Sequence, residues 1–192
     1  MMASRVFQCL EPEEREQGLQ AAEAAVKEGR CVVLPTDTVY GIGADAFNNQ
    51  AVATLLATKR RGPDMPVPVL VGSWTTIQGL VREFTETGKT LVEAFWPGGL
   101  SIVVPEAPSL PWNLGDTRGT VLLRMPNQPL ALELLQRTGP MAVSSANLTS
   151  NPPALNAAAA RQQFGDAVGV YLEGGPAEVG TPSTIIDISG PN

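Results

Sequence analysis

Five groups of polar side chains at the ends of predicted strands are the residues of this sequence best suited to chemistry. The groups are Thr36, Thr38 and Tyr40; Lys59 and Arg61; Arg124; Ser144, Ser145 and Asn147; and Ser183 with Thr184. Ligands of mixed α/β sheets favour crevices at strand ends, so folding could bring these groups into one site. Cations combined with hydroxyl and amide groups suit a small anionic ligand. The sequence contains no histidine, which excludes an imidazole base and a histidine-bound metal.

Most of these groups also have a purely structural interpretation. Thr36 and Thr38 could cap a turn, the helix end at Lys59 could be solvated and suit the helix dipole, and Ser145 could belong to a strand-to-helix turn. Arg124 is harder to explain structurally, because it follows the apolar run Val-Leu-Leu inside a predicted strand. A charge in that position is costly unless it is paired with an anion.

Two stretches resemble phosphate-binding loops. GIGADA, residues 41–46, matches the dinucleotide fingerprint, but a polar stretch interrupts the strand before it and Asp45 would place a carboxylate in the phosphate site. We expect Gly41 and Gly43 to permit a tight turn instead. Gly88-Lys89-Thr90 resembles the end of a P-loop, whose first glycine would fall at Glu83. We expect the exposed start of a helix there, with Lys89 in solvent.

The elements that must position these residues follow from hydrophobic spacing and from capping residues. Helices are predicted at 12–29, 48–59, 74–81, 86–96, 129–139 and 156–165, and strands at 31–34, 66–72, 100–104, 120–125, 141–146, 169–172 and 183–189. Pro66 and Pro68 place the second strand at a sheet edge or near a bulge. Residues 174–181, GGPAEVGT, are the best candidate for a mobile segment, because they offer little to bury.

Length and composition fit one globular domain spanning residues 1–192. The 192 residues are 43% hydrophobic, enough for a full core. Strands and helices mix without regular alternation, which predicts an α/β (α+β) domain on one twisted mixed sheet surrounded by helices. No stretch resembles a signal peptide or the ~20 apolar residues of a membrane span, so a cytoplasmic protein is expected. Cys9 and Cys31 alone argue against a disulfide framework or a cysteine-rich zinc site.

The charge distribution also limits the choice of ligand. The net charge is −6, which disfavours bulk attraction to nucleic acid. Lys59, Arg60 and Arg61 are nevertheless consecutive, and Arg118 and Arg124 lie close together further on. A local cationic site in an acidic protein suits a small anion better than a polymer.

Six motifs carry a resemblance to a known family. They are PTDTVYG at 35–41, the Lys-x-Arg of LATKRRGP at 56–63, FWPG at 95–98, LLRMP at 122–126, SSAN-L at 144–148 and PSTIID at 182–187. In this order and spacing they resemble the YrdC family of threonylcarbamoyl-AMP synthases. The resemblance runs from about residue 30 to residue 187 and is to the short, single-domain members. It implies a YrdC-like fold with a concave ligand-binding face.

The resemblance implies an enzyme that combines L-threonine, bicarbonate and ATP, with Mg²⁺, into threonylcarbamoyl-AMP and pyrophosphate. A downstream tRNA threonylcarbamoyl-transferase complex would then modify tRNA, which the enzyme itself would contact at most weakly and indirectly. The implied threonine-binding residues are Thr36, Thr38, Tyr40, Arg124, Ser145 and Ser183. The implied nucleotide-binding residues are Lys59, Arg61, Ser145 and Asn147, with Lys59 and Arg61 as the catalytic pair that contacts the phosphates. The resemblance implies no protein-held metal.

One departure and three alternatives remain open. Leu70 stands where family members often carry a histidine near the threonine site, and Arg60 competes with Arg61 for the phosphates. We choose Arg61 from the Lys-x-Arg spacing.

The main alternative function is a non-catalytic RNA-binding module with a YrdC-like fold. The others are the YrdC-like part of a hydrogenase-maturation carbamoyltransferase, which would need zinc-binding cysteines, and a dinucleotide enzyme built on GIGADA.

Overall fold

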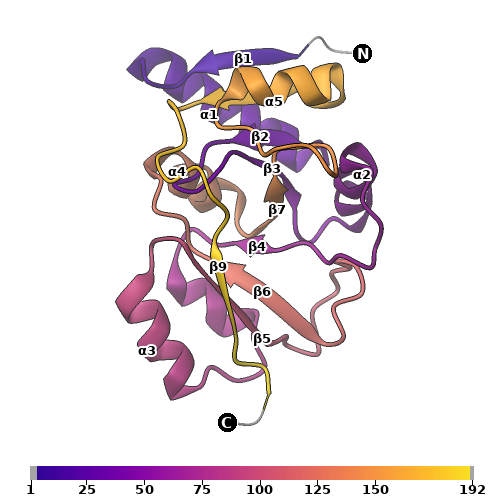
Figure 1. The fold of residues 1–192 in the computed structure, drawn as a ribbon, viewed down its shortest axis with the longest axis vertical. Helices are drawn as coiled ribbons and strands as arrows, with labels where there is room; N and C mark the ends of the chain where they lie inside the picture. The colour runs from indigo at the N-terminus through magenta and orange to yellow at the C-terminus, as the bar shows by residue number, and fades with distance from the viewer. Residues whose placement is uncertain (1–3, 191–192) are drawn as a thin grey trace.

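Nine strands form one mixed sheet in the computed structural model, which describes residues 4–190 (Figure 1). The strand order is β1-β8-β2-β3-β7-β4-β6-β5-β9. The strands are β1 (Arg5–Gln8), β2 (Val32–Leu34), β3 (Gly41–Asp45), β4 (Val69–Leu70), β5 (Leu100–Pro105), β6 (Thr120–Arg124), β7 (Met141–Ser145), β8 (Val170–Glu173) and β9 (Thr184–Asp187). The predicted fold class, a twisted mixed α/β sheet, is confirmed.

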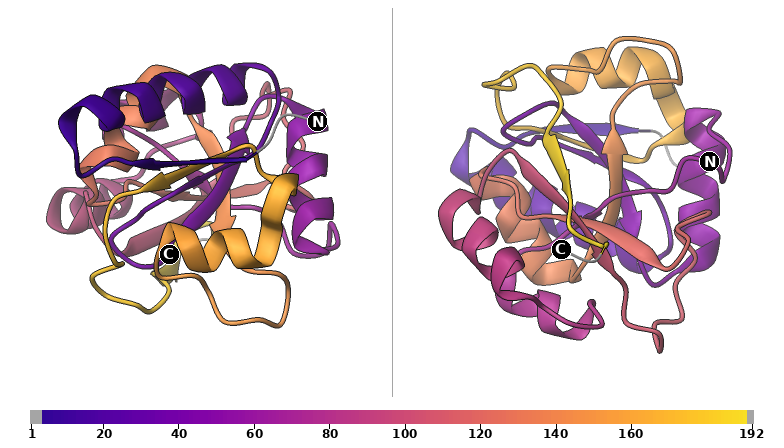
Figure 2. Two further views of the ribbon diagram at one scale, coloured as in Figure 1. Left: turned by 90° about the horizontal axis from the view of Figure 1, so that it is seen from above. Right: turned by 60° about the horizontal axis from the view of Figure 1, so that its bottom comes forward.

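Five α-helices and two short 3₁₀ helices cover this sheet (Figures 1 and 2). They are α1 (Pro12–Lys27), α2 (Asn49–Lys59), η1 (Trp74–Gly79), α3 (Glu86–Phe95), α4 (Pro129–Thr138), α5 (Ala157–Phe164) and η2 (Gly165–Ala167). Each predicted helix is present, with ends shifted by a few residues and with residues 74–79 as a 3₁₀ helix. As expected, Lys89 is solvated near the start of α3, where its side chain is 45% exposed. None of the helices within residues 4–190 has the length and apolar character to cross a membrane.

The sheet separates two hydrophobic cores. Helices α1 and α4 pack on one face, with Leu19 and Leu134 fully buried against β2, β7 and β8. Helices α2 and α5 pack on the other face, where Leu55 and Phe164 meet Ile42 of β3. Both faces of the central strands are therefore covered, and the strand ends are the places where polar residues can gather around a ligand.

Local sequence explains where helices α1 and α2 begin and end. Asn48 caps α2 by accepting a hydrogen bond from the backbone N–H of Ala51 at 3.1 Å. Helix α1 begins with Pro12 and ends before Gly29, whose φ of +75° is the left-handed conformation that glycine adopts at low cost. Helix α2 ends at Arg60, which takes the same conformation with a φ of 56°. The turn after α2 directs Arg61 back toward the sheet.

Two expectations about the sheet are wrong. GIGADA forms strand β3 and not a tight turn, and its glycines are needed for packing: a Cβ on Gly41 would lie 2.6 Å from Cγ1 of Val143. Residues 66–72 were expected as a strand at a sheet edge or near a bulge. They contribute only the two-residue β4, which lies between β7 and β6 in the interior of the sheet and not at its edge. Pro66 and Pro68 precede the paired residues, so their missing N–H groups fall outside the ladder.

One strand was not predicted at all. Strand β1 pairs in parallel with β8, from Arg5 opposite Val170 to Gln8 opposite Glu173. Its four residues show only one buried side chain, that of Phe7. So short a segment carries almost no periodic signal, and its pairing partner lies at the other end of the chain.

The glycine packing gives a stability prediction. Gly41→Ala should lower the free energy of unfolding by about 1–3 kcal/mol, because the new methyl group collides with Val143, whose β-branched side chain is stiff. Urea denaturation measures the effect. Gly79→Ala is the matched control, since no described atom lies within 4 Å of the added methyl group, and it should change stability by less than about 0.5 kcal/mol. Equal stabilities of the two variants would contradict the packing argument.

Candidate active site

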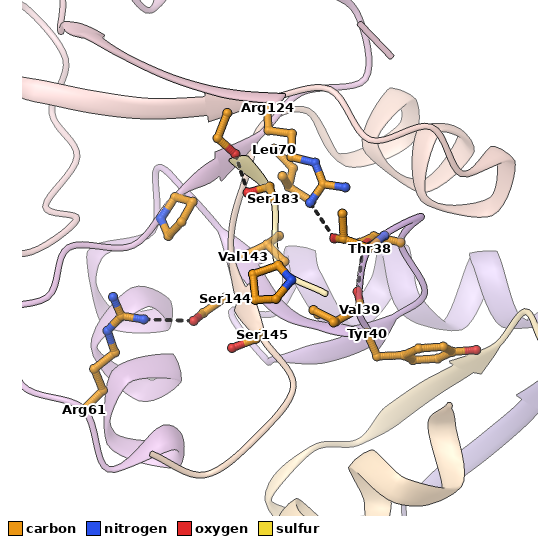
Figure 3. Close-up of a pocket in the computed structure, with 15 residues that line it drawn as sticks. Thr38, Val39, Tyr40, Arg61, Leu70, Arg124, Val143, Ser144, Ser145 and Ser183 are labelled. Atoms are coloured by element: carbon orange, nitrogen blue, oxygen red, sulfur yellow. Dashed lines mark hydrogen bonds between the residues drawn. The ribbon is translucent and has the colours of Figure 1, made fainter. Parts of the chain in front are cut away.

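A cavity of about 220 Å³ lies where the turn between β2 and β3 meets the ends of β6 and β7 (Figure 3). Leu70 and Val143 form an apolar part of its wall. The polar part includes six of the residues predicted from sequence: Thr36, Thr38, Arg61, Arg124, Ser145 and Ser183. Segments that are up to about 150 residues apart in the chain, from Thr36 to Ser183, therefore converge as expected.

Arg124 is the buried centre of the polar wall. Its guanidinium donates to the carbonyl oxygen of Gly98 at 3.0 Å, to Oγ1 of Thr38 at 2.8 Å and to Oδ1 of Asp37 at 2.5 Å. The residue is only 6% exposed. Burial lowers the pKa of Arg124, and the carboxylate of Asp37 acts in the opposite direction. The ion pair keeps the cation in place at the end of β6.

Asp37 is a site residue that the sequence reasoning missed. Besides Arg124, its Oδ1 accepts the backbone N–H of Asn127 at 3.1 Å, and its side chain is 9% exposed. The anion that a buried Arg124 requires is therefore supplied partly from within the protein. The available signal was the aspartate inside PTDTVYG, directly after the buried strand β2.

An arginine guanidinium carries five N–H donors. Three of those on Arg124 are used in the hydrogen bonds to Gly98, Thr38 and Asp37. One N–H on Nη1 and one on Nη2 remain without a partner in residues 4–190. Arg124 also lines the cavity. A pair of such donors on one guanidinium matches the two oxygens of a carboxylate.

The turn that carries Thr36 and Thr38 is ordered by its own hydroxyls. Oγ1 of Thr36 donates to the carbonyl oxygen of Val39 at 2.6 Å and accepts the backbone N–H of Thr38 at 3.2 Å. The two Oγ1 atoms of the threonines lie 3.1 Å apart. Both interpretations of these residues thus apply, since they stabilise a turn and line the cavity.

Arg61, and not Arg60, lines the cavity. Its guanidinium donates to Oγ of Ser144 at 3.0 Å and to the carbonyl oxygens of Met65 and Pro66 at 2.9 and 3.1 Å (Figure 3). Burial lowers the pKa of Arg61. Arg60 is the exposed C-cap of α2. Of the two arginines, Arg61 is therefore the one beside the cavity, and its predicted contact with phosphates remains a prediction.

Lys59 supports the wall of the cavity from behind. It is not among the lining residues in the described part of the chain, and it is 2% exposed. Its Nζ donates to the carbonyl oxygen of Ser145 and, at 2.7 Å, to that of Asn147. Burial, and to a smaller extent the charge of Arg61, lowers the pKa of Lys59 to about 8. Its predicted contact with phosphates remains a prediction.

Ser145 and Asn147 occupy different environments. Ser145 lines the cavity at the end of β7. Asn147 lies in the following loop, where its Nδ2 donates to the carbonyl oxygens of Leu148 and Asn151 at 3.0 and 2.9 Å. Within residues 4–190, its buried Oδ1 has no hydrogen-bond partner. Asn147 is not among the residues that line the cavity in the described part of the chain, so its predicted contact with the nucleotide remains a prediction.

Ser183 reaches the cavity from the far end of the chain. Its Oγ lies 2.7 Å from Oγ of Ser101, a buried residue of β5 that also lines the cavity and that the sequence reasoning missed. Ser101 gave no signal, because it stands inside the apolar run of its strand. The segment before Ser183, predicted as mobile, is bonded to the turn between β2 and β3: Val179 and Gly180 donate their N–H groups to the carbonyl oxygens of Asp37 and Thr38.

The hydroxyl of Tyr40 is directed away from the cavity, in contrast to its predicted role as a threonine ligand (Figure 3). It lies 2.7 Å from both Oε1 of Glu173 and the carbonyl oxygen of Gly175. Tyr40 contributes to the cavity wall, but its polar end is occupied. The sequence could not reveal this, because the partner Glu173 is 133 positions away.

The fold and this cavity define a mixed α/β protein with a small cavity at the ends of its strands, lined by arginine and hydroxyl side chains. The chain belongs to the Sua5/YciO/YrdC family, whose model, described as "Telomere recombination", matches residues 24–192. The resemblance carried by the six motifs is thereby confirmed.

Two curated relatives support this assignment. A Mycobacterium tuberculosis protein is 57% identical over 187 residues, which cover 97% of this chain and 86% of the relative. That relative is named "Putative threonylcarbamoyl-AMP synthase". The threonylcarbamoyl-AMP synthase of Pyrococcus abyssi is 32% identical over 172 residues, which cover 89% of this chain. The match spans 51% of that relative, about half its length.

Solved structures show the same fold. The crystal structure of P. abyssi Sua5 complexed with L-threonine has a TM-score of 0.87 and 30% identity, covering 98% of this chain and 54% of the other. Escherichia coli YciO, with a TM-score of 0.81, covers 99% of this chain and 91% of its own. At 20% identity, YciO supports the fold alone. Together the comparisons favour a synthase over a non-catalytic RNA-binding module.

The buried position of Lys59 gives a pH prediction. Its pKa of about 8 in the folded protein is below the ordinary 10.5, so unfolding takes up a proton between these pH values. The stability of the wild type relative to Lys59→Met should therefore rise from pH 8 to pH 10.5, by at most about 1.4 kcal/mol per pH unit. Urea denaturation across this range measures it.

The matched control is Lys27→Met, because Lys27 has a side chain 67% exposed on α1. The stability difference between the wild type and this control should stay constant over the same pH range. A constant difference for Lys59→Met as well would show that its ammonium is not desolvated.

Proposed function

We propose that the protein is an L-threonylcarbamoyladenylate synthase, a nucleotidyltransferase that converts L-threonine, bicarbonate and ATP into threonylcarbamoyl-AMP and pyrophosphate. The observation that carries the proposal is the buried Arg124, which lines a small cavity, is oriented by Asp37 and Thr38, and keeps two N–H groups that no described residue accepts. The P. abyssi relative of known structure is described as complexed with L-threonine, which supports the same substrate.

Threonine fits the cavity through three kinds of contact. The remaining N–H groups of Arg124 would hold its carboxylate in a bidentate pair. Hydroxyls of Thr38, Ser145 or Ser183 would bond its side-chain hydroxyl, and the apolar wall of Leu70 and Val143 would contact its methyl group. Leu70 replaces the histidine of many family members with an apolar contact. The cavity of about 220 Å³ is small for a drug-sized ligand and suits an amino acid.

The nucleotide would lie beside threonine, toward Arg61. Arg61 and Ser145 line the cavity on the β7 side, so Arg61 would offset charge on the phosphates. Two donors of the Lys59 ammonium are bonded to carbonyl oxygens, and its third would reach the phosphates. Asn147, in the loop that follows β7, would be a further contact of the nucleotide.

The reaction requires alignment more than a protein nucleophile. The amine of threonine and bicarbonate give a carbamate with loss of water. A carbamate oxygen then bonds to the α-phosphorus of ATP, the bond from that phosphorus to the bridging oxygen breaks, and pyrophosphate leaves with the electron pair. Fixed cations stabilise the charge that develops on the leaving group. Arg61, which lines the cavity, and Lys59 would do so without a histidine or an activated cysteine.

Mg²⁺ enters this proposal as the companion of ATP. Residues 4–190 contain no group of three or more Asp, Glu, Cys or His side chains that could hold a metal ion. The ion would therefore be bound mainly by phosphates and water, as Mg²⁺ commonly is in ATP-dependent enzymes.

The product suggests the cellular setting. An acyl adenylate is an activated group donor, so a downstream tRNA threonylcarbamoyl-transferase complex would consume it, and we place the enzyme in the cytoplasm. The net charge of −6 argues against strong direct binding of tRNA. Submicromolar tRNA affinity at physiological salt without ATP turnover would instead favour the RNA-binding module.

The proposed reaction predicts pyrophosphate release from ATP that depends on both L-threonine and bicarbonate. Valine lacks the hydroxyl, so the buried polar groups would lose a partner and its kcat/KM should be lower by about 100-fold or more. A coupled pyrophosphate assay measures both effects, and mass spectrometry identifies the adenylate. Equal rates with serine, valine and threonine would contradict the amino-acid specificity.

The role of Arg124 gives a second prediction. Arg124→Lys should raise the KM for threonine by about 10- to 100-fold, because an ammonium cannot reproduce the bidentate pair with a carboxylate. The KM for ATP should change much less. Steady-state kinetics with each substrate varied in turn measures this separation.

Arg137→Lys is the matched control, since Arg137 lies on α4 and binds Glu16 and Glu133 at the surface. Its kinetic constants should equal those of the wild type. If Arg124→Lys alters neither KM, Arg124 does not hold the substrate.

A further inference from the structure

The segment from Gly174 to Ser183, which we call the strap, connects β8 to β9 and closes one side of the cavity (Figures 1 and 3). Pro182 and Ser183 bring its C-terminal end into the cavity wall. The strap is largely exposed, and Val179 is 59% exposed. Little apolar burial holds it down, so its position depends on hydrogen bonds.

The middle and the C-terminal end of the strap are tied to the site itself. Val179 and Gly180 donate to the carbonyl oxygens of Asp37 and Thr38 at 3.1 and 2.9 Å. Ser183 pairs with Ser101 through their hydroxyls. The carbonyl oxygens of Asp37 and Thr38 therefore hold the middle of the strap. The side chains of the same two residues orient Arg124. A displacement of the strap would therefore disturb the same turn that positions the guanidinium.

The N-terminal end is held by a hydrogen-bond network around Glu173. Its Oε1 lies 2.7 Å from the hydroxyl of Tyr40 and accepts the N–H of Gly175 at 2.8 Å. Its Oε2 accepts the N–H of Ala157 at 2.9 Å. The carboxylate thus joins the β2–β3 turn, the strap and the first residue of α5.

Tyr40 connects this network to the cavity. Its hydroxyl accepts the N–H of Gly174 at 3.0 Å, and its single hydrogen is shared between Glu173 and the carbonyl oxygen of Gly175. The backbone of Tyr40 pairs with Ala146, whose N–H it accepts at 2.7 Å. One residue therefore bonds the strap with its side chain and the end of β7 with its main chain.

We propose that Tyr40 and Glu173 are positioning residues, which hold the strap so that Ser183 stays at a fixed place beside Arg124 for threonine binding. This inference rests on the proposed function, because it assumes threonine as the ligand. Tyr40 acts through the strap, because its hydroxyl is bonded to Glu173 and Gly175 and is directed away from the cavity.

Tyr40→Phe tests the inference with a minimal change. It should raise the KM for threonine about tenfold, through the lost hydrogen bonds of the strap, and change kcat by less than about twofold. Amide hydrogen exchange at Val179 and Gly180, measured without substrate, should become faster than in the wild type.

The matched control is Tyr171→Phe. The chain has two tyrosines, both fully buried, and the hydroxyl of Tyr171 donates to a glycine carbonyl oxygen, that of Gly165, at 2.7 Å. A general loss of stability would affect both variants. Only Tyr40→Phe should alter the KM for threonine and the exchange of the strap amides.

A double-mutant cycle with Glu173→Ala tests whether the two residues act together. If they act through one network, each single variant should raise the KM for threonine, and the double variant should raise it little further. Multiplicative effects would show independent roles and overturn the inference.

The outcomes separate this inference from the proposed function. If the wild type releases no threonine-dependent pyrophosphate, the function is wrong, and the exchange data still report the anchoring of the strap. If the wild type is active but Tyr40→Phe leaves both the KM and the strap exchange unchanged, the positioning role is overturned. Equal effects of Tyr171→Phe would also overturn it.

Discussion

The ion pair between Asp37 and Arg124 is the interaction on which the site depends. Both partners are nearly inaccessible to water, and removing one member of a buried pair costs about 3–5 kcal/mol, because the other charge is left unpaired. Asp37 comes from the turn after β2 and Arg124 from the end of β6, so the pair fixes two distant parts of the sheet relative to each other. Thr38 and Gly98 complete the shell of the guanidinium.

This constraint explains how an acidic protein presents a cationic cavity. The carboxylate of Asp37 neutralises one arginine internally, and Arg61 brings a second positive charge that no carboxylate contacts closely among the described residues. The remaining lining groups are hydroxyls and apolar side chains. Such a site can orient anions and stabilise developing negative charge, but it offers no strong base, in agreement with a reaction that proceeds by alignment.

The sequence was sufficient for much of the fold and for the main members of the site. Periodicity and caps located most helices and strands, and Arg124 was recognised because a charge in an apolar strand needs a partner. Its partner Asp37 was missed, since the sequence does not show which anion a buried cation will meet. Tyr40 was assigned to threonine for a similar reason: its bond to Glu173 depends on long-range packing. The interior position of β4 likewise follows from pairing with β6 and β7, which two residues cannot encode locally.

The parallel pairing of β9 with β5 has a consequence for biosynthesis. Ile186 lies opposite Ile102, and closing so long a loop is entropically expensive, which makes such pairings slow to form. During translation, β5 emerges from the ribosome long before its neighbour exists. The nascent polypeptide can therefore build the central sheet early, but the wall carrying Ser183 is added only after β9 has been synthesised. The cavity is thus complete only once the segment carrying Ser183 has been made.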